Sequence, residues 1–185
     1  MDWTVTALTV VALTIAGTVL AAVLWSIAKP DRRVWPPQTF GPATSILTWG
    51  GTLVFFASVV LLGIAGWGDA PLPGWLRYGL APILIATGNA VVWSGVIGFG
   101  ANQTMGAEGR LKTDGFYRFS RNPQYVADIV ILIGWTLFSA SLVALPAVIA
   151  GVVVFVAFPL AEESWLEERY GAAYLRYKAA VRRFL

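Results

Sequence analysis

The 185-residue chain contains no cysteine and no histidine. Without cysteine there are no disulfides and no thiol nucleophile, and without histidine the commonest general base near neutral pH is missing. The strong metal ligands that remain are carboxylates, so no metal site is predicted. Charge is scarce as well, because Asp, Glu, Lys and Arg make up 12% of the residues, against about 25% in an average soluble domain. These absences disfavour a soluble protein.

Hydrophobic residues make up 57% of the chain, and the mean hydropathy is +0.69. The length predicts one domain, and a helix crosses a hydrocarbon core of about 30 Å with about 20 apolar residues. We therefore expect a single integral membrane domain over residues 1–185, all-α and polytopic, with five transmembrane helices. The expected spans are residues 3–28, 45–67, 76–99, 124–138 and 142–161.

The first expected span, residues 3–28, is not expected to be a cleaved signal peptide, because no basic residue precedes it and its apolar stretch is too long. Residues 124–138 are few for a full crossing, and Ser139-Ala140-Ser141 separates them from the next span. We expect the last two spans to form a helical hairpin with one short leg.

The tail from Ser164 onward carries charged and apolar residues together. Its apolar and aromatic residues recur at spacings of three and four, which is typical of an amphipathic helix: Leu166, Tyr170, Tyr174, Tyr177, Val181 and Phe184. A C-terminal amphipathic helix is therefore predicted. It serves either as an anchor at the membrane surface or as a lid over a neighbouring loop.

The basic residues predict an orientation. With five spans, twelve of the thirteen Lys and Arg residues fall in loops 28–44 and 100–125 and in the tail, and only Arg77 falls on the other side. The positive-inside rule then places the tail in the cytoplasm and the N-terminus outside, in the cell membrane. These charges lie beside apolar spans, so the predicted partners are membrane lipids and not nucleic acid.

The stretch Leu111–Tyr125, LKTDGFYRFSRNPQY, is an island of charge between apolar segments. It combines a glycine turn, aromatic residues, arginines and an Asn122-Pro123 break directly before a new apolar run. This pattern indicates a loop that binds an anionic or zwitterionic group at a membrane boundary. Glu162 and Glu163 follow a later apolar run, and we interpret the two segments as one site.

These residues carry a family resemblance. LKTDGFYRFSRNPQY, the later EESWLEERYGAAYLRY and the closing VRRFL resemble the isoprenylcysteine carboxyl methyltransferase and phospholipid methyltransferase superfamily of integral membrane enzymes. The resemblance covers residues 98–185, the expected cofactor-binding core, whereas residues 1–97 match only in being hydrophobic and are expected to be variable spans. In one departure, Asn122 stands where the family's R-H-P-x-Y motif usually has histidine.

The resemblance implies S-adenosylmethionine as the cofactor and assigns its contacts. Glu162 and Glu163 suit the amino group or the ribose hydroxyls, and Arg121 with the backbone near Asn122 suits the carboxylate. The remaining cofactor-binding candidates are two tyrosines, beside adenine or methionine, and the glycines of a G-x-G: Tyr117, Tyr125, Gly98 and Gly100. Simpler interpretations stay open at this stage, namely helix termination for the glycines, lipid headgroup contact for the arginines and a solvated helix segment for the glutamates.

The catalytic candidates are Glu163, Arg121 and Asp128. A carboxylate acceptor needs no general base, whereas an amine or thiol acceptor must lose a proton to Glu162, Glu163 or Asp128. The sequence does not choose between these acceptors.

We expect a lipophilic or lipid acceptor that enters sideways from the bilayer, through a gap beside the third span. Its expected lining is Val92, Trp93, Val96, Ile129 and Leu132. Two alternatives remain: a membrane reductase of the sterol reductase type that uses NADPH, and a non-catalytic membrane scaffold.

Overall fold

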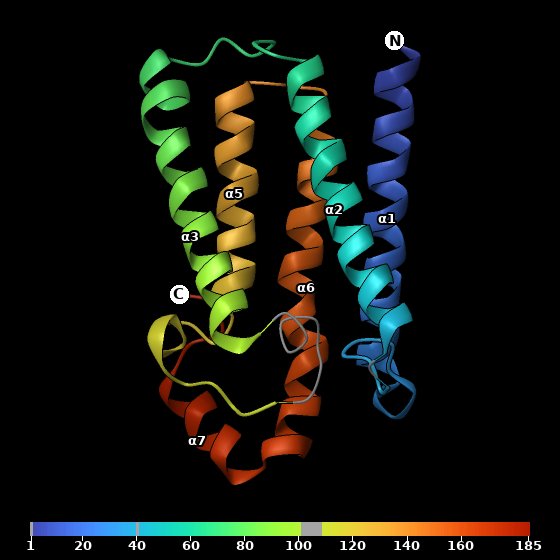
Figure 1. Cartoon of the computed structure of the whole chain (residues 1–185), viewed down its shortest axis with the longest axis vertical. Helices are drawn as coiled ribbons and strands as arrows, with labels where there is room; N and C mark the ends of the chain where they lie inside the picture. The colour runs from blue at the N-terminus through green and yellow to red at the C-terminus, as the bar shows by residue number, and fades with distance from the viewer. Residues whose placement is uncertain (1, 40, 101–108) are drawn as a thin grey trace.

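The computed structural model describes residues 2–39, 41–100 and 109–185, and within these residues all regular structure is helical. In this described part of the chain, six α-helices form an elongated bundle closed at one end by the tail (Figure 1). They are α1 (Trp3–Ala28), α2 (Pro42–Ala65), α3 (Ala81–Phe99), α5 (Pro123–Ser139), α6 (Leu145–Tyr170) and α7 (Ala172–Ala180). Three short helical segments join them: η1 (Pro30–Arg32), η2 (Trp75–Leu80) and η3 (Gly115–Arg118).

Within the described residues, four helical segments are long and apolar enough to cross a membrane: Trp3–Ala28, Pro42–Ala65, Trp75–Gly98 and Leu145–Tyr170. The protein is therefore an integral membrane protein. The fifth expected span is α5, which has 17 residues and a length of about 25 Å at about 1.5 Å per residue. It runs beside the longer helices (Figure 1), and Ala140, in the left-handed conformation at its C-cap, begins the turn into α6. The exact count of five spans stays a prediction.

Helices α3 and α5 approach closely because glycines leave space between them. A Cβ atom at Gly88 would lie 2.6 Å from the Ile131 side chain and 2.9 Å from the carbonyl oxygen of Ala127. A Cβ atom at Gly134 would lie 2.9 Å from the side chain of Ile85. Small residues at such contacts are the usual way in which membrane helices pack, since lipid tails remove the hydrophobic drive for association.

The buried core lies on the other side of the bundle, between α1, α2, α5 and α6. Its fully buried members include Ala12 of α1, Leu62 of α2 and Leu132 of α5. Gly151 of α6 fits against Phe55, whose ring would lie 2.7 Å from an added Cβ. This packing holds α6 beside α1 and α2, and so fixes the helix that carries Glu162.

Arg77 fastens the end of the bundle opposite the tail. Its guanidinium donates to the carbonyl oxygens of Phe138 and Ser139, both at 3.2 Å, and lies over the ring of Trp67 at 5.3 Å. A cation at a helix C-terminus satisfies carbonyls that lack partners within the helix. The loop between α1 and α2, the loop before α5 and the tail gather at the opposite end (Figure 1), so the twelve other basic residues lie at that end, as the expected topology requires.

The tail differs from its prediction. The helix expected from Ser164 onward is not separate there, because α6 continues through Pro159 to Tyr170. Gly171, at φ 52°, ends α6, and α7 covers only Ala172–Ala180 before Val181 turns extended. The predicted aromatic face holds in part, because Tyr174 and Tyr177 are buried in α7.

We expect Gly88→Ala to destabilise the protein by about 1–3 kcal/mol, the usual cost of overpacking a close contact. Gly50→Ala is the matched control, because no atom lies within 4 Å of the added methyl group; removing a glycine from a helix there should be neutral or stabilising by up to about 1 kcal/mol. Unfolding by SDS in mixed micelles measures both. Equal stability of the two variants would contradict the close α3–α5 contact.

Cysteine labelling tests the topology, because the native chain has no cysteine. Asp69 and Arg176 are exposed at opposite ends of the bundle. In intact inverted vesicles and spheroplasts, Asp69→Cys and Arg176→Cys should react with an impermeant maleimide from opposite sides. Labelling of both from one side would rule out an odd number of crossings.

Candidate functional site

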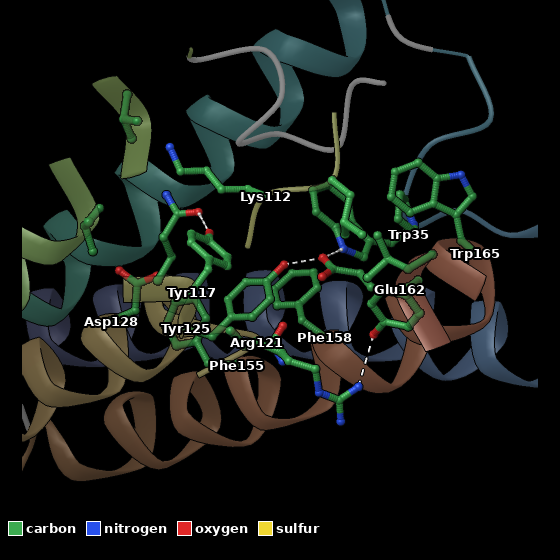
Figure 2. Close-up of a pocket in the computed structure, with 18 of the residues that line it drawn as sticks. Trp35, Lys112, Tyr117, Arg121, Tyr125, Asp128, Phe155, Phe158, Glu162 and Trp165 are labelled. Carbon is green, nitrogen blue, oxygen red and sulfur yellow. Dashed lines mark hydrogen bonds between the residues drawn. The ribbon is translucent and has the colours of Figure 1, made fainter. Parts of the chain in front are cut away.

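A pocket lies at the basic end of the bundle, where the loop after η1, helices α2, α3, α5 and α6, and the tail converge. Figure 2 shows polar groups at its two ends and aromatic rings between them. Asp128 and Lys112 lie toward one end, and Trp35, Glu162 and Trp165 toward the other.

Glu162 is held at one end of the pocket by two donors. Its Oε1 accepts hydrogen bonds from Trp35 Nε1 at 2.7 Å and from the hydroxyl of Tyr125. The Tyr125 ring stacks on Phe158, with centroids 5.1 Å apart and planes 6° apart. An ionised carboxylate has about four acceptor positions, so Glu162 keeps acceptor capacity toward the pocket. A carboxylate among aromatic faces is well suited to bind a cation.

The other end of the pocket is organised by Tyr117 and Gln124. The Tyr117 hydroxyl donates to Gln124 Oε1 at 3.0 Å, and burial raises the pKa of Tyr117, which keeps this donor protonated. Gly95 of α3 makes room for the amide, since a Cβ there would lie 2.5 Å from Gln124 Nε2. Asp128, one turn further along α5, lines the same end.

Glu163 faces the tail. It forms ion pairs with Arg121 at 3.1 Å, with Lys178 at 3.1 Å and with Arg183 at 2.7 Å. The carboxylate is nearly buried, with a side chain 10% exposed, so this cluster joins α6, the loop before α5 and the tail. Lys178 donates hydrogen bonds to Glu167 and Glu163, and these bonds raise its pKa, which keeps it charged in this contact.

The tail is also bound to the loop before α5. Arg121 N–H donates to the carbonyl of Arg182 and Asn122 Nδ2 to that of Arg183, both at 2.9 Å. Tyr177 donates its hydroxyl to the carbonyl of Tyr117 at 2.7 Å, and burial raises its pKa to about 12. Tyr174 and Tyr177 line the pocket, so α7 covers it as a lid would. Asn122, the departure from the family motif, contributes to this attachment.

The structure brings most of the predicted site residues together. Six of them line the pocket: Tyr117, Arg121, Asn122, Tyr125, Asp128 and Glu162. Glu163 lies outside that lining, beside the tail. Gly98 and Gly100 also lie outside it; Gly98 approaches Lys112, and Gly100 ends α3 at φ 81°. Segment 101–108, within the predicted loop, lies outside the described residues.

The predicted gap beside α3 and α5 is wrong in part. Val92 and Val96 line the pocket, but Leu132 is buried in the core and Ile129 packs against it. Trp93 is exposed, at 54%, and is not part of the lining. The close α3–α5 contact through Gly88 explains the difference, because it leaves no passage between these helices. The lining continues instead from α3 to Thr48, Trp49 and Thr52 of α2.

Several lining residues were not predicted. Gln124 lies inside the stretch Leu111–Tyr125. Its position one helical turn before Asp128 could have indicated that both side chains face the same site. Phe155 and Phe158 have the i, i+3 spacing of one helix face. Trp35 could not be identified from its local sequence, because Glu162, to which it donates a hydrogen bond, is 127 residues away in the chain.

The family model for phospholipid methyltransferases matches residues 76–173, slightly more than half of the chain. The chain belongs to this family. The match includes the pocket residues of α3, α5 and α6 but not Trp35 of the first loop. Membership in a family of membrane methyltransferases favours that activity over the reductase and the scaffold.

One similar curated protein is described as an uncharacterized protein of Haemophilus influenzae. It is 40% identical over 62 residues, which cover 33% of this phospholipid methyltransferase family member and 98% of that protein. No solved structure matches the chain.

Glu163→Gln should lower the free energy of unfolding by about 1.5–3 kcal/mol, the range for hydrogen bonds to charged groups, and should make the tail more sensitive to protease. Glu167→Gln is the matched control, since Glu167 is 38% exposed and its only ion pair within the described part of the chain is with Lys178; a loss below about 1 kcal/mol is expected. SDS unfolding and limited trypsin digestion measure the two effects. A tail that is equally protected in both variants would argue against the Glu163 cluster as its anchor.

Proposed function

We propose that the protein is an S-adenosylmethionine-dependent methyltransferase that acts on a lipophilic acceptor in the cell membrane. The observation that carries the proposal is the placement of Glu162, held by Trp35 and Tyr125 beside the stacked Tyr125–Phe158 pair. The pocket thereby offers an oriented carboxylate and aromatic faces to a positively charged ligand, in a chain of a methyltransferase family.

The residues present fit this cofactor. When bound, S-adenosylmethionine supplies a methyl group on a positively charged sulfur, together with an ammonium and a carboxylate. Glu162 suits the cationic part. Arg121, whose Nε is buried and has no hydrogen-bond partner within the described residues, suits the carboxylate. Tyr117 and the Tyr125 ring suit the remaining parts of the molecule.

The remaining predicted residues have less direct roles in this proposal. Glu163 lies beside Arg121 and fixes its position through their ion pair at 3.1 Å, so we infer that it supports the site without touching the cofactor. A direct catalytic role for Glu163, and contacts to Gly98 and Gly100, stay predictions. The backbone N–H of Asn122 donates to Ser120 Oγ at 3.1 Å, so a cofactor contact by the backbone near Asn122 also stays a prediction.

The acceptor is proposed to enter from the bilayer between α2 and α3. Both helices supply pocket residues, namely Thr48, Trp49 and Thr52 from α2 and Val92 and Val96 from α3. Helix α3 packs along α5, and α2 packs mainly on α1. In Figure 1, α5 and α6 are visible between α2 and α3. The pocket lies at the end that carries twelve of the thirteen basic residues, which favours the cytoplasmic side, where the cofactor is available.

The chain's own contribution to the reaction is mainly orientation. Holding two reactants in line lowers a barrier by about 7–11 kcal/mol in favourable cases. Here Trp35 and Tyr125 donate to Glu162 and hold it at the end of the pocket proposed to bind the cation. The tail covers the pocket and limits access of water. Trp49 of α2 and Val92 and Val96 of α3 direct a hydrocarbon chain toward the same space.

Calorimetry of the purified protein tests this function with three ligands: S-adenosylmethionine, its demethylated product and NADPH. We expect the first two to bind and NADPH not to bind. Glu162→Gln should weaken binding of S-adenosylmethionine by about 1.5–3 kcal/mol. Glu168→Gln is the control, because Glu168 is exposed and lies outside the pocket lining. Binding of NADPH alone, or equal affinity in both variants, would refute the proposed site.

A further inference from the structure

A groove lies on the other face of the α3–α5 pair from the pocket, toward the basic end of the bundle. The two linings alternate along each helix. On α3, Val91 lines the groove and Val92 the pocket, and on α5, Val126 lines the groove and Tyr125 the pocket. Thr87, one turn before Val91, is exposed on a segment long enough to cross a membrane. The groove therefore opens toward the bilayer and is separate from the proposed cofactor site.

The lining of the groove suits a hydrocarbon. Both of its hydroxyl groups are already engaged. Thr87 donates to the carbonyl oxygens of Ile83 and Leu84 at 2.7 and 3.2 Å, and Ser120 donates to that of Arg183 at 3.3 Å. The other lining residues are glycine, alanine, proline, valine, phenylalanine and leucine. The volume of about 190 Å³ is below the roughly 300–1,000 Å³ of a pocket that encloses a whole ligand, so the groove fits part of one chain.

Exposed apolar side chains line the end of the groove that is nearest the loops. Phe116 and Phe119 of the η3 loop are 49% and 72% exposed, although charged residues surround them in sequence. Leu185 joins them, and in Figure 1 the end of the chain lies beside the lower parts of α3 and α5. Apolar side chains exposed together mark a surface that contacts a membrane or a partner. Their place at the ends of membrane helices favours the membrane interface.

Two arginines supply positive charge beside these apolar side chains. Arg118 lies between the two phenylalanines of η3 in sequence, and Arg182 lies three residues before Leu185. The carbonyl oxygen of Arg182 accepts from the Arg121 N–H at 2.9 Å, which brings the tail next to the η3 loop. Both arginines are exposed, and neither forms an ion pair within residues 2–39, 41–100 and 109–185. A guanidinium matches a phosphate group, with which it forms two parallel hydrogen bonds.

We propose that the groove is a binding site for an anionic phospholipid, which lays one acyl chain against α3 and α5 and places its phosphate between Arg118 and Arg182. The argument for this occupant is complementarity in both of its parts, an apolar groove for the chain and two exposed cations for the headgroup. A zwitterionic lipid carries its own cation beside the phosphate and gains less from the arginines. The site goes beyond the proposed methyltransferase function, because the groove shares no lining residue with the pocket.

The groove is connected to the tail through the η3 loop. Ser120, a groove residue, donates to the carbonyl of Arg183. The carbonyl of Tyr117, next to Phe116, accepts from the Tyr177 hydroxyl of α7 at 2.7 Å. A lipid in the groove thus holds the loop to which the tail is bound, so the protein with lipid should resist unfolding better than the protein without it.

Native mass spectrometry of the purified protein in detergent tests the site with three probes: dilauroyl phosphatidylglycerol, dilauroyl phosphatidylcholine and glycerol 3-phosphate. The two lipids share their chains and differ in net charge, and the third probe has no chain. Phosphatidylglycerol should bind at least about tenfold more tightly than the other two, since each basic residue at an anionic surface contributes about a fivefold factor.

Substitution of the arginines locates the headgroup. Arg118→Gln and Arg182→Gln should each lower the affinity for phosphatidylglycerol about fivefold. Arg176→Gln is the matched control and should retain it, because Arg176 is exposed on α7 at the same end of the bundle and lies outside the groove.

Filling the groove locates the chain. Val91→Phe should remove most of the binding of phosphatidylglycerol, whereas Ala90→Phe, at an exposed position of α3 outside both linings, should retain it. The arginine substitutions lie on the surface, so they keep the test decisive if Val91→Phe does not fold.

Equal binding of the two lipids, or an affinity that neither arginine variant lowers, would overturn the lipid site. Two further results would also overturn it: glycerol 3-phosphate that binds as tightly as phosphatidylglycerol, which indicates a site for a free anion, and unchanged binding in a folded Val91→Phe, which places the lipid elsewhere. None of these measurements involves the cofactor, so the proposed function stands or falls separately by calorimetry.

Discussion

The ion pairs of Glu163 hold the pocket end of the molecule together. This carboxylate meets one cation from the loop before α5 and two from the tail, so three segments distant in sequence share one nearly buried charge. Breaking one partner of such a cluster leaves uncompensated buried charge. The position of Arg121 in the pocket and the closure by α7 therefore depend on the same contact. Glu162 is the neighbour of Glu163 in α6, so its place in the pocket is fixed by the same helix.

Glu162 and Glu163 are neighbours in sequence but have different surroundings. Successive residues of an α-helix point about 100° apart, so one side chain faces the aromatic pocket and the other the basic tail. Neutral donors surround Glu162, which keeps its charge available to a ligand, whereas cations neutralise Glu163. One dipeptide thus provides a carboxylate that lines the pocket and a carboxylate that anchors the tail.

Much of the fold could be predicted from the sequence, since the apolar runs and their breakers locate the membrane helices to within a few residues. Residues of the 111–125 stretch and Glu162 could also be grouped as one site, because they cluster at the ends of those runs. The rotation of α6 about its own axis, relative to the neighbouring helices, could not be predicted. The different surroundings of Glu162 and Glu163 therefore appear only in the structure. The predicted passage beside Leu132 failed because hydrophobicity does not distinguish a side chain that lines a path from one that packs in a core. The continuation of α6 beyond residue 161 to Tyr170 was missed because the change in composition at Ser164 was taken as a helix boundary.

The hydrogen bond from Trp35 to Glu162 links the two halves of the chain. Trp35 lies before the part that the family model matches, while Glu162 lies within it. The N-terminal helices are thus more than a membrane anchor, because the loop between them completes the surroundings of a pocket carboxylate. A chimera that exchanges the segment before residue 76 between two family members would keep the part that the family model matches and still alter the surroundings of Glu162, unless the incoming segment brought its own donor for this glutamate.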